Sequence, residues 1–181
     1  MKKILPLLIG LISLNISAQK YFTKTGSTEF KASVEAFEPV EAVNKSTTVI
    51  LNSENGQIAG LLFVKAFHFE IALMQEHFNE NYMDSDKYPK ATFRGQLVGF
   101  DLSELTTQEK ELSLKGTLTV KGKDKIIDTT AKLKKEGDKI IFTSVFGVSP
   151  QDFDIKIPSI VRDKIAKSIN LTLNYELVKK K

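Results

Sequence analysis

The chain has 181 residues, with 26 lysines and arginines against 22 aspartates and glutamates, and it contains neither cysteine nor tryptophan. This charge balance argues against a nucleic-acid-binding surface, which needs basic residues concentrated on one face. The one basic cluster, residues 179–181, is typical of a solvated tail. Without cysteine there is no disulfide framework and no thiol nucleophile, so the hydrophobic core alone must hold the protein together.

The first eighteen residues have the pattern of a secretory signal peptide. Two lysines precede an apolar segment, residues 4–16, that is too short to span a bilayer. Because Ala18 supplies the small residue that a cleavage site needs, we expect cleavage between Ala18 and Gln19 and export to the periplasm or the medium. The remaining residues, 19–181, carry 24 basic and 22 acidic side chains and are enough for one domain.

After the signal peptide, apolar and polar residues alternate with the period of a β-strand. In residues 111–121, for example, Leu112, Leu114 and Leu118 share one face while Lys115 lies on the other. Short turn signals separate such segments at Asn55-Gly56, at residues 122–124 and at residues 136–138. The expected strands are residues 30–36, 46–52, 57–69, 90–100, 110–121, 125–135, 139–148 and 168–178.

Eight long strands with one apolar face each predict an all-β, up-and-down antiparallel barrel, because closure removes the exposed edges of a sheet. A two-sheet sandwich is the alternative, and only the length of the strands favours the barrel. Two segments interrupt the strands. The first is a helix near Ala72–Met83, and the second is Ser149–Lys167, where two prolines exclude a strand and Ser159 is expected to cap a short helix through Ile165.

Three segments of the chain resemble the YceI-like family of secreted lipid-binding proteins. The resemblance implies a lipocalin-like eight-stranded barrel, a polyisoprenoid ligand and a periplasmic location. It covers most of the expected mature chain. The residues that carry it are His77–Met83 (HFNENYM), Lys87–Pro89 (KYP), Ala91 and Phe93 within Glu76–Gly95, residues 116–122 (GTLTVKG) and residues 152–177.

The sequence contains no motif typical of catalysis. A G-x-S-x-G elbow, a phosphate-binding glycine loop and an H-E-x-x-H pair are all missing. His68 and His77 are nine residues apart, which is not a metal-ligand spacing. We therefore predict no catalytic residues, no metal and no cofactor. A less favoured hypothesis gives His77, together with Glu76, Glu80 or Tyr82, an acid–base role on a lipid headgroup.

Large apolar side chains on the expected inward faces make up the predicted ligand site. An eight-stranded barrel is just wide enough to be filled by its own side chains or to hold one small ligand, so these residues either fill a core or line a cavity. The predicted ligand-binding residues are Phe63, Phe67, Phe69, Met74, Phe78, Phe93, Leu97, Leu114, Leu118, Phe142 and Phe146.

Small residues on the same faces favour a cavity. Ala91, Gly95, Gly99 and Gly116 leave space between larger neighbours, although Gly95 and Gly99 would equally fit strand bends. Either face of the strand that contains Phe63 could be internal. We favour the phenylalanine face, which would bring a lysine at position 65 to the barrel mouth, near a ligand headgroup.

The predicted function is that of an exported carrier that sequesters a long-chain isoprenoid or other lipid without chemistry. Burial yields about 0.8 kcal/mol per carbon group and association costs about 4–15 kcal/mol, so several isoprene units are needed. The helix and the Pro150–Pro158 segment are expected to cover the barrel mouth. We expect transient contact with a membrane. The sequence does not decide between a monomer and a homodimer. A solid barrel with a structural or interaction role is the alternative.

Overall fold

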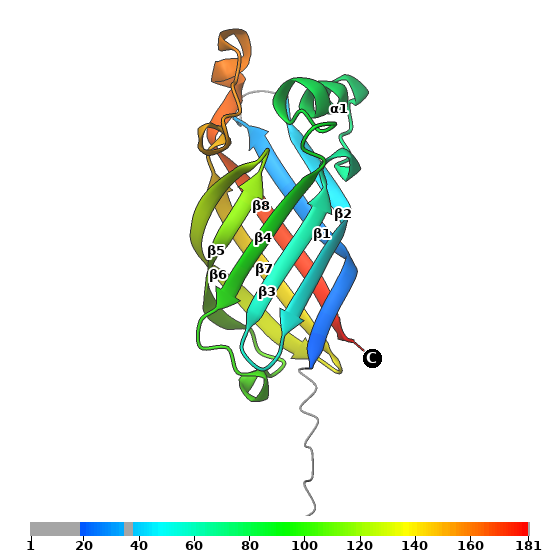
Figure 1. Cartoon of the computed structure of the whole chain (residues 1–181), viewed down its shortest axis with the longest axis vertical. Coiled ribbons are helices and arrows are strands. Elements are labelled where there is room, and N and C mark those ends of the chain that lie inside the picture. The colour runs from blue at the N-terminus through cyan, green and yellow to red at the C-terminus, as the bar shows by residue number, and fades with distance from the viewer. Residues whose placement is uncertain (1–18, 35–37, 181) are drawn as a thin grey trace, which may run out of the picture.

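The computed structural model describes residues 19–34 and 38–180, and the predicted signal peptide lies outside this part of the chain. Eight antiparallel strands form a closed barrel in which each strand pairs with the next and the last pairs with the first, which confirms the expected barrel (Figure 1). The strands are β1 (Lys20–Ser33), β2 (Glu41–Asn52), β3 (Gln57–Phe63), β4 (Lys90–Leu97), β5 (Lys110–Val120), β6 (Lys123–Glu136), β7 (Lys139–Val148) and β8 (Ile165–Lys179).

The first two strands begin earlier than the sequence pattern predicted. They were expected at residues 30–36 and 46–52, but they start at Lys20 and Glu41. Each strand contains a β-bulge, and two consecutive exposed residues shift its inside–outside alternation: residues 24 and 25 in β1 and residues 45 and 46 in β2. The inward positions near the bulges hold threonine, glycine and asparagine, so the apolar periodicity is weak there.

Asn44 holds the β2 bulge in place. Its side-chain nitrogen donates to the carbonyl of Phe63 at 3.0 Å, and its oxygen accepts from the backbone N–H of Ser46 at 2.9 Å. The Asn44 side chain is completely buried, so these bonds offset the cost of removing it from water.

The third strand is shorter than expected, because it ends at Phe63 rather than at residue 69. A 3-10 turn, η1 (Val64–Ala66), follows, and the extended chain resumes where His68 pairs with Val43. The helix expected at residues 72–83 is present as α1 (Ala72–His77), which continues into a π-helical turn, η2 (Phe78–Tyr82).

The second interruption contains two short 3-10 helices, η4 (Pro150–Phe153) and η5 (Ser159–Lys164). The expected cap by Ser159 is wrong, because Pro158 occupies the capping position and no side chain there makes a capping hydrogen bond. The turn expected at residues 122–124 is also displaced. It lies at Lys121-Gly122, both in the left-handed region, and the next two residues already pair with β5.

Both interruptions lie at the same end of the barrel, which we call the α1 end (Figure 1). The opposite end, called the floor, contains the short helix η3 (Leu102–Glu104) and the turn at Gly56, whose φ of 72° fits the predicted Asn55-Gly56 turn. Among the helices of residues 19–34 and 38–180, none is long and apolar enough to cross a bilayer.

Candidate functional site: an apolar cavity in the barrel

The barrel encloses a cavity of about 490 Å³ whose lining is almost entirely apolar. This volume lies within the range of about 300–1,000 Å³ that is usual for small-molecule sites. Seven strands, all except β6, contribute to the lining, as do the helical segment after β3 and the segment between β7 and β8. The cavity therefore extends along the barrel axis from the interior to the α1 end.

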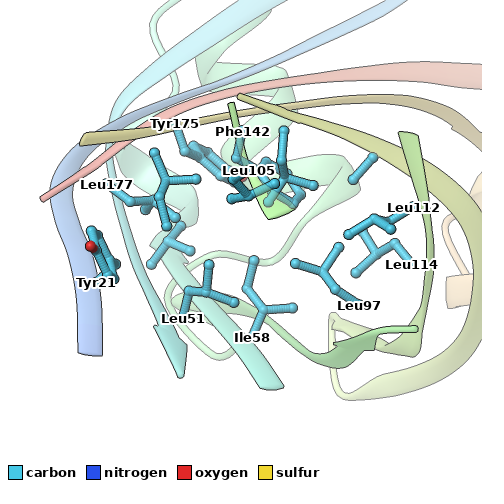
Figure 2. Packing of buried hydrophobic residues seen from close by; sticks show 14 residues of the cluster. Tyr21, Leu51, Ile58, Leu97, Leu105, Leu112, Leu114, Phe142, Tyr175 and Leu177 are labelled. Atoms are coloured by element: carbon cyan, nitrogen blue, oxygen red, sulfur yellow. The ribbon is translucent and has the colours of Figure 1, made fainter. Parts of the chain in front are cut away.

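A tightly packed cluster closes the floor. Leu51, Leu97, Leu133 and Leu177 are fully buried in it, and Leu105 from the connection between β4 and β5 packs among them. Figure 2 shows Leu51, Leu97 and Leu177 converging from different strands. Because such packing leaves no space for a chain, a ligand cannot pass through this end.

Four phenylalanines form a second cluster at the α1 end. The rings of Phe30 and Phe78 stack with centroids 5.3 Å apart, while Phe67 and Phe69 lie 5.7 and 5.1 Å from Phe78. Aromatic pairs of this kind contribute about 0.5–1.5 kcal/mol beyond burial. The cluster attaches the helical segment to β1, and its members also line the cavity.

The cavity reaches solvent at the α1 end. Its lining there includes the exposed residues Glu38 and Lys164, whereas Leu114 and Phe142, deeper in the barrel, are 2% and 1% exposed. Apolar residues of the segment between β7 and β8, Ile155 among them, line this opening. The two segments expected as covers thus both border the opening, although their closure on a ligand stays a prediction.

Nine of the eleven predicted ligand-binding residues line the cavity, and two do not. Leu97 is fully buried in the floor cluster rather than in the cavity wall. Phe63 is 51% exposed on the outside, where the Lys90 ammonium lies 5.4 Å from its ring centroid. The nine lining residues are Phe67, Phe69, Met74, Phe78, Phe93, Leu114, Leu118, Phe142 and Phe146.

The preferred inward face of β3 was therefore wrong for Phe63. Leu62 and Val64 point inward, and the 3-10 turn then changes the phase so that Phe67 also points inward. Lys65 does not reach the mouth to meet a headgroup, because its ammonium pairs with the Asp86 carboxylate at 2.6 Å on the outer surface. A three-residue turn inside an alternating run has no clear sequence signal, which explains the error.

The glycines create space in a different way from the one expected. A Cβ at Gly95 or Gly116 would lie 2.6 Å from the ring of Phe93, so these glycines accommodate that ring rather than the ligand. Gly99 lies beyond β4 with a φ of 70°, in a turn. Gly60 was missed: it lines the cavity, and a Cβ there would meet its nearest neighbours only at 3.9 Å.

Three hydroxyl groups were also missed. Thr28 Oγ1 lies 2.8 Å from Thr47 Oγ1 and 2.9 Å from Tyr175 Oη, and all three residues are buried and line the cavity. Burial raises the pKa of Tyr175 to about 12, and the bond with Thr28 opposes this shift. The phenol is therefore neutral at physiological pH. We call these three residues the hydroxyl cluster.

The polar groups at the mouth are sparse. His77 and Tyr82 line the cavity, but Glu76 and Glu80 are exposed and are not part of its wall. Within residues 19–34 and 38–180, no three His, Asp or Glu side chains are grouped so that they could hold a metal ion. This geometry gives no support to the less favoured acid–base hypothesis for His77, because Glu76 and Glu80 do not converge with it on the cavity.

A closed eight-stranded antiparallel barrel with an apolar cavity open at one end defines a lipocalin-like protein. The family model that matches is the YceI-like domain, over residues 16–177. The chain therefore belongs to the YceI-like family, as its sequence resemblance indicated. Among curated proteins, a search finds no match.

Solved structures share this fold at low sequence identity. A polyisoprenoid-binding domain from Saccharophagus degradans, implicated in plant cell wall breakdown, aligns with a TM-score of 0.76 and 12% identity, covering 89% of this chain and 98% of its own. Burkholderia cenocepacia BcnA aligns with a TM-score of 0.68 and 17% identity, covering 84% of this chain and 95% of its own. A mutant of the Campylobacter jejuni YCEI protein aligns with a TM-score of 0.64 and 18% identity, covering 80% of this chain and 87% of its own.

Proposed function

We propose that this protein is an exported carrier that sequesters the apolar chain of an isoprenoid or a similar lipid. The observation that carries the proposal is the apolar cavity of about 490 Å³ within a closed barrel. The structurally similar Saccharophagus degradans domain, described as polyisoprenoid-binding, supports the choice of ligand. A solid barrel is the less favoured alternative, because its interior would be filled as the floor cluster is filled.

The volume of the cavity sets the size of the ligand. At about 30 Å³ per group of the size of a water molecule, 490 Å³ accommodates ~16 heavy atoms. At about 0.8 kcal/mol per carbon group, ~15 buried carbons give roughly 12 kcal/mol before association costs of about 4–15 kcal/mol. About three isoprene units would therefore lie inside, and the remainder of a longer chain would leave through the α1 end.

The carrier acts without chemistry. Ligand binding requires only apolar contacts, and most of the lining residues provide them. An enzyme would need titratable groups placed around one reacting atom, whereas His77 and Tyr82 are the titratable groups that the helical segment contributes to the cavity wall. Membership of the YceI-like family supports a binding protein as well.

Export and membrane contact complete the proposal. The signal-peptide pattern of the first eighteen residues supports a periplasmic or secreted protein. Two exposed apolar side chains at the open end, Leu73 (58%) and Ile160 (85%), support transient contact of that end with a bilayer. Lys156 and Arg162, close to Ile160 in the sequence, are exposed and would favour an anionic lipid surface.

The function is tested by transfer of a tritiated polyprenol from phosphatidylcholine vesicles to the purified protein, followed by flotation of the vesicles. We expect saturable recovery of about one polyprenol per barrel in the soluble fraction. A second sample with Phe93→Glu, which places a charge in the cavity wall, should recover none. No uptake by the folded wild-type protein, with or without prior delipidation, would contradict the proposed function.

A further inference from the structure

The hydroxyl cluster lies at mid-height in the cavity, between the phenylalanine cluster and the floor. Along β1, the inward residue before Thr28 is Gly26, and the inward residue after it is Phe30 of the phenylalanine cluster. Along β8, Tyr175 belongs to the floor cluster and its ring stacks on that of Phe142 with centroids 5.5 Å apart. A polar group therefore interrupts an otherwise apolar wall about halfway along the path of the ligand.

The position of Tyr175 is set by neighbouring residues. A Cβ at Gly26 would lie 2.6 Å from Cδ1 of the tyrosine ring, so the glycine leaves room for the ring to lie against β1. Stacking on Phe142 holds its other side. The phenol oxygen is thus held beside Thr28, and the cluster is a rigid feature of the wall.

A count of protons shows that the cluster can donate one more hydrogen bond. Three hydroxyl groups carry three protons, and the two bonds that join them use two. Within residues 19–34 and 38–180, no other protein acceptor is bonded to any of the three oxygens. Whichever hydroxyl donates in each of the two bonds among Thr28, Thr47 and Tyr175, one of the three protons remains unused. At least one O–H is therefore available to an acceptor in the cavity.

We propose that the hydroxyl cluster is a polar subsite that receives a neutral oxygen acceptor of the lipid, such as a carbonyl or hydroxyl oxygen, inside the barrel. This proposal rests on the proposed lipid-binding function and adds a chemical preference to it. An anionic group is excluded from this place, because the surrounding wall is apolar and none of the three side chains carries a charge. The lipid would therefore carry a neutral oxygen-bearing group, either at the end that enters the barrel first or within its chain.

The test compares two saturated probes of the same carbon skeleton, farnesane and hexahydrofarnesol, which differ by one hydroxyl group. Their partition from vesicles is measured for the wild type and for the triple variant Thr28→Val/Thr47→Val/Tyr175→Phe. The triple variant is needed because removal of one hydroxyl still leaves a free proton on the other two. These replacements change the volume of the wall little, and circular dichroism checks that the variant is folded. The ratio of the two affinities is compared, so that a change in binding common to both probes cancels.

We expect the preference for the alcohol over the hydrocarbon to be roughly three- to tenfold larger in the wild type than in the variant, the effect of one neutral hydrogen bond. An equal preference in both proteins would overturn the subsite while leaving the carrier function intact. Absence of binding of either probe to the folded wild type would instead refute the carrier function.

A second measurement does not depend on the variant. The infrared carbonyl band of bound hexahydrofarnesylacetone should shift to lower frequency than in hexadecane, because an O–H donor polarises the C=O bond. A band at the hexadecane position in the wild-type complex would overturn the proposal.

Discussion

Replacement of Gly60 by leucine is the sharpest test of an open cavity. Gly60 faces the cavity from β3, and a Cβ there would meet Phe93 and Val49 only at 3.9 Å. The leucine side chain would therefore extend into empty space. Its four carbons take up about 120 Å³ at ~30 Å³ each, which is roughly a quarter of the 490 Å³.

The expected effect depends on the length of the ligand. An alcohol that fills the wild-type cavity loses room for about four carbons in Gly60→Leu, which costs about 3 kcal/mol, or roughly 200-fold in affinity. An alcohol of about ten carbons still fits and should bind almost as before, since ~370 Å³ remains. The assay is competition of straight-chain alcohols of increasing length against a retained tritiated probe.

Stability provides the second readout of the same variant. A glycine within a strand weakens it by about 0.5–1 kcal/mol, so Gly60→Leu should keep or raise the free energy of unfolding. The matched control is Ala59→Leu, the next residue on the outer face, which should leave the length profile unchanged. If the interior were solid, leucine at position 60 would overpack it and cost about 1–3 kcal/mol. That loss, or an equal affinity change at every chain length, would refute the reasoning.

Three further predictions follow from the same geometry. Phe93→Glu and Phe142→Asp should each abolish copurification of lipid, because each would bury an unpaired charge in the cavity wall. Lipid analysis checks the loss, and circular dichroism checks folding. A folded variant that retains lipid would show that the pocket lies elsewhere. Hydrogen exchange should slow in Ala72–Met83 and Pro150–Pro158 when lipid binds, and protection confined to the strands would remove their role as covers. Because burial raises the pKa of Tyr175 to about 12 from the ordinary 10, its contribution to stability is complete below pH 10 and is lost as the pH rises towards 12. Urea unfolding at pH 9 and pH 12 should therefore show a fall about 2 kcal/mol larger in the wild type than in Tyr175→Phe, and equal falls would contradict the burial of the phenol.

Residue alternation was sufficient to predict the barrel but not its local irregularities. The inward faces of β5, β6 and β8 were predicted correctly, because Leu114, Leu133 and Tyr175 alternate with polar residues. The bulges in β1 and β2 and the 3-10 turn after Phe63 change the phase of alternation within a run. Such changes depend on pairing with a neighbouring strand, which a single sequence does not reveal.

The cavity was predicted from the right residue types but partly for the wrong reason. Gly95 and Gly116 are small because the ring of Phe93 lies over them, and the space for a ligand is next to Gly60 instead. The hydroxyl cluster joins β1, β2 and β8, and its partners Thr28 and Tyr175 are 147 positions apart. No sequence spacing indicates that these side chains meet, so only the closed barrel shows the contact.

Native mass spectrometry of the freshly purified, exported protein tests the central claim most directly. The proposed function predicts a complex heavier than the mature chain by the mass of one lipid, which disappears under denaturing conditions and returns when the delipidated protein is mixed with a polyprenol. A spectrum with the mass of the protein alone, both as purified and after addition of the polyprenol, would contradict a lipid-binding cavity and favour a solid barrel.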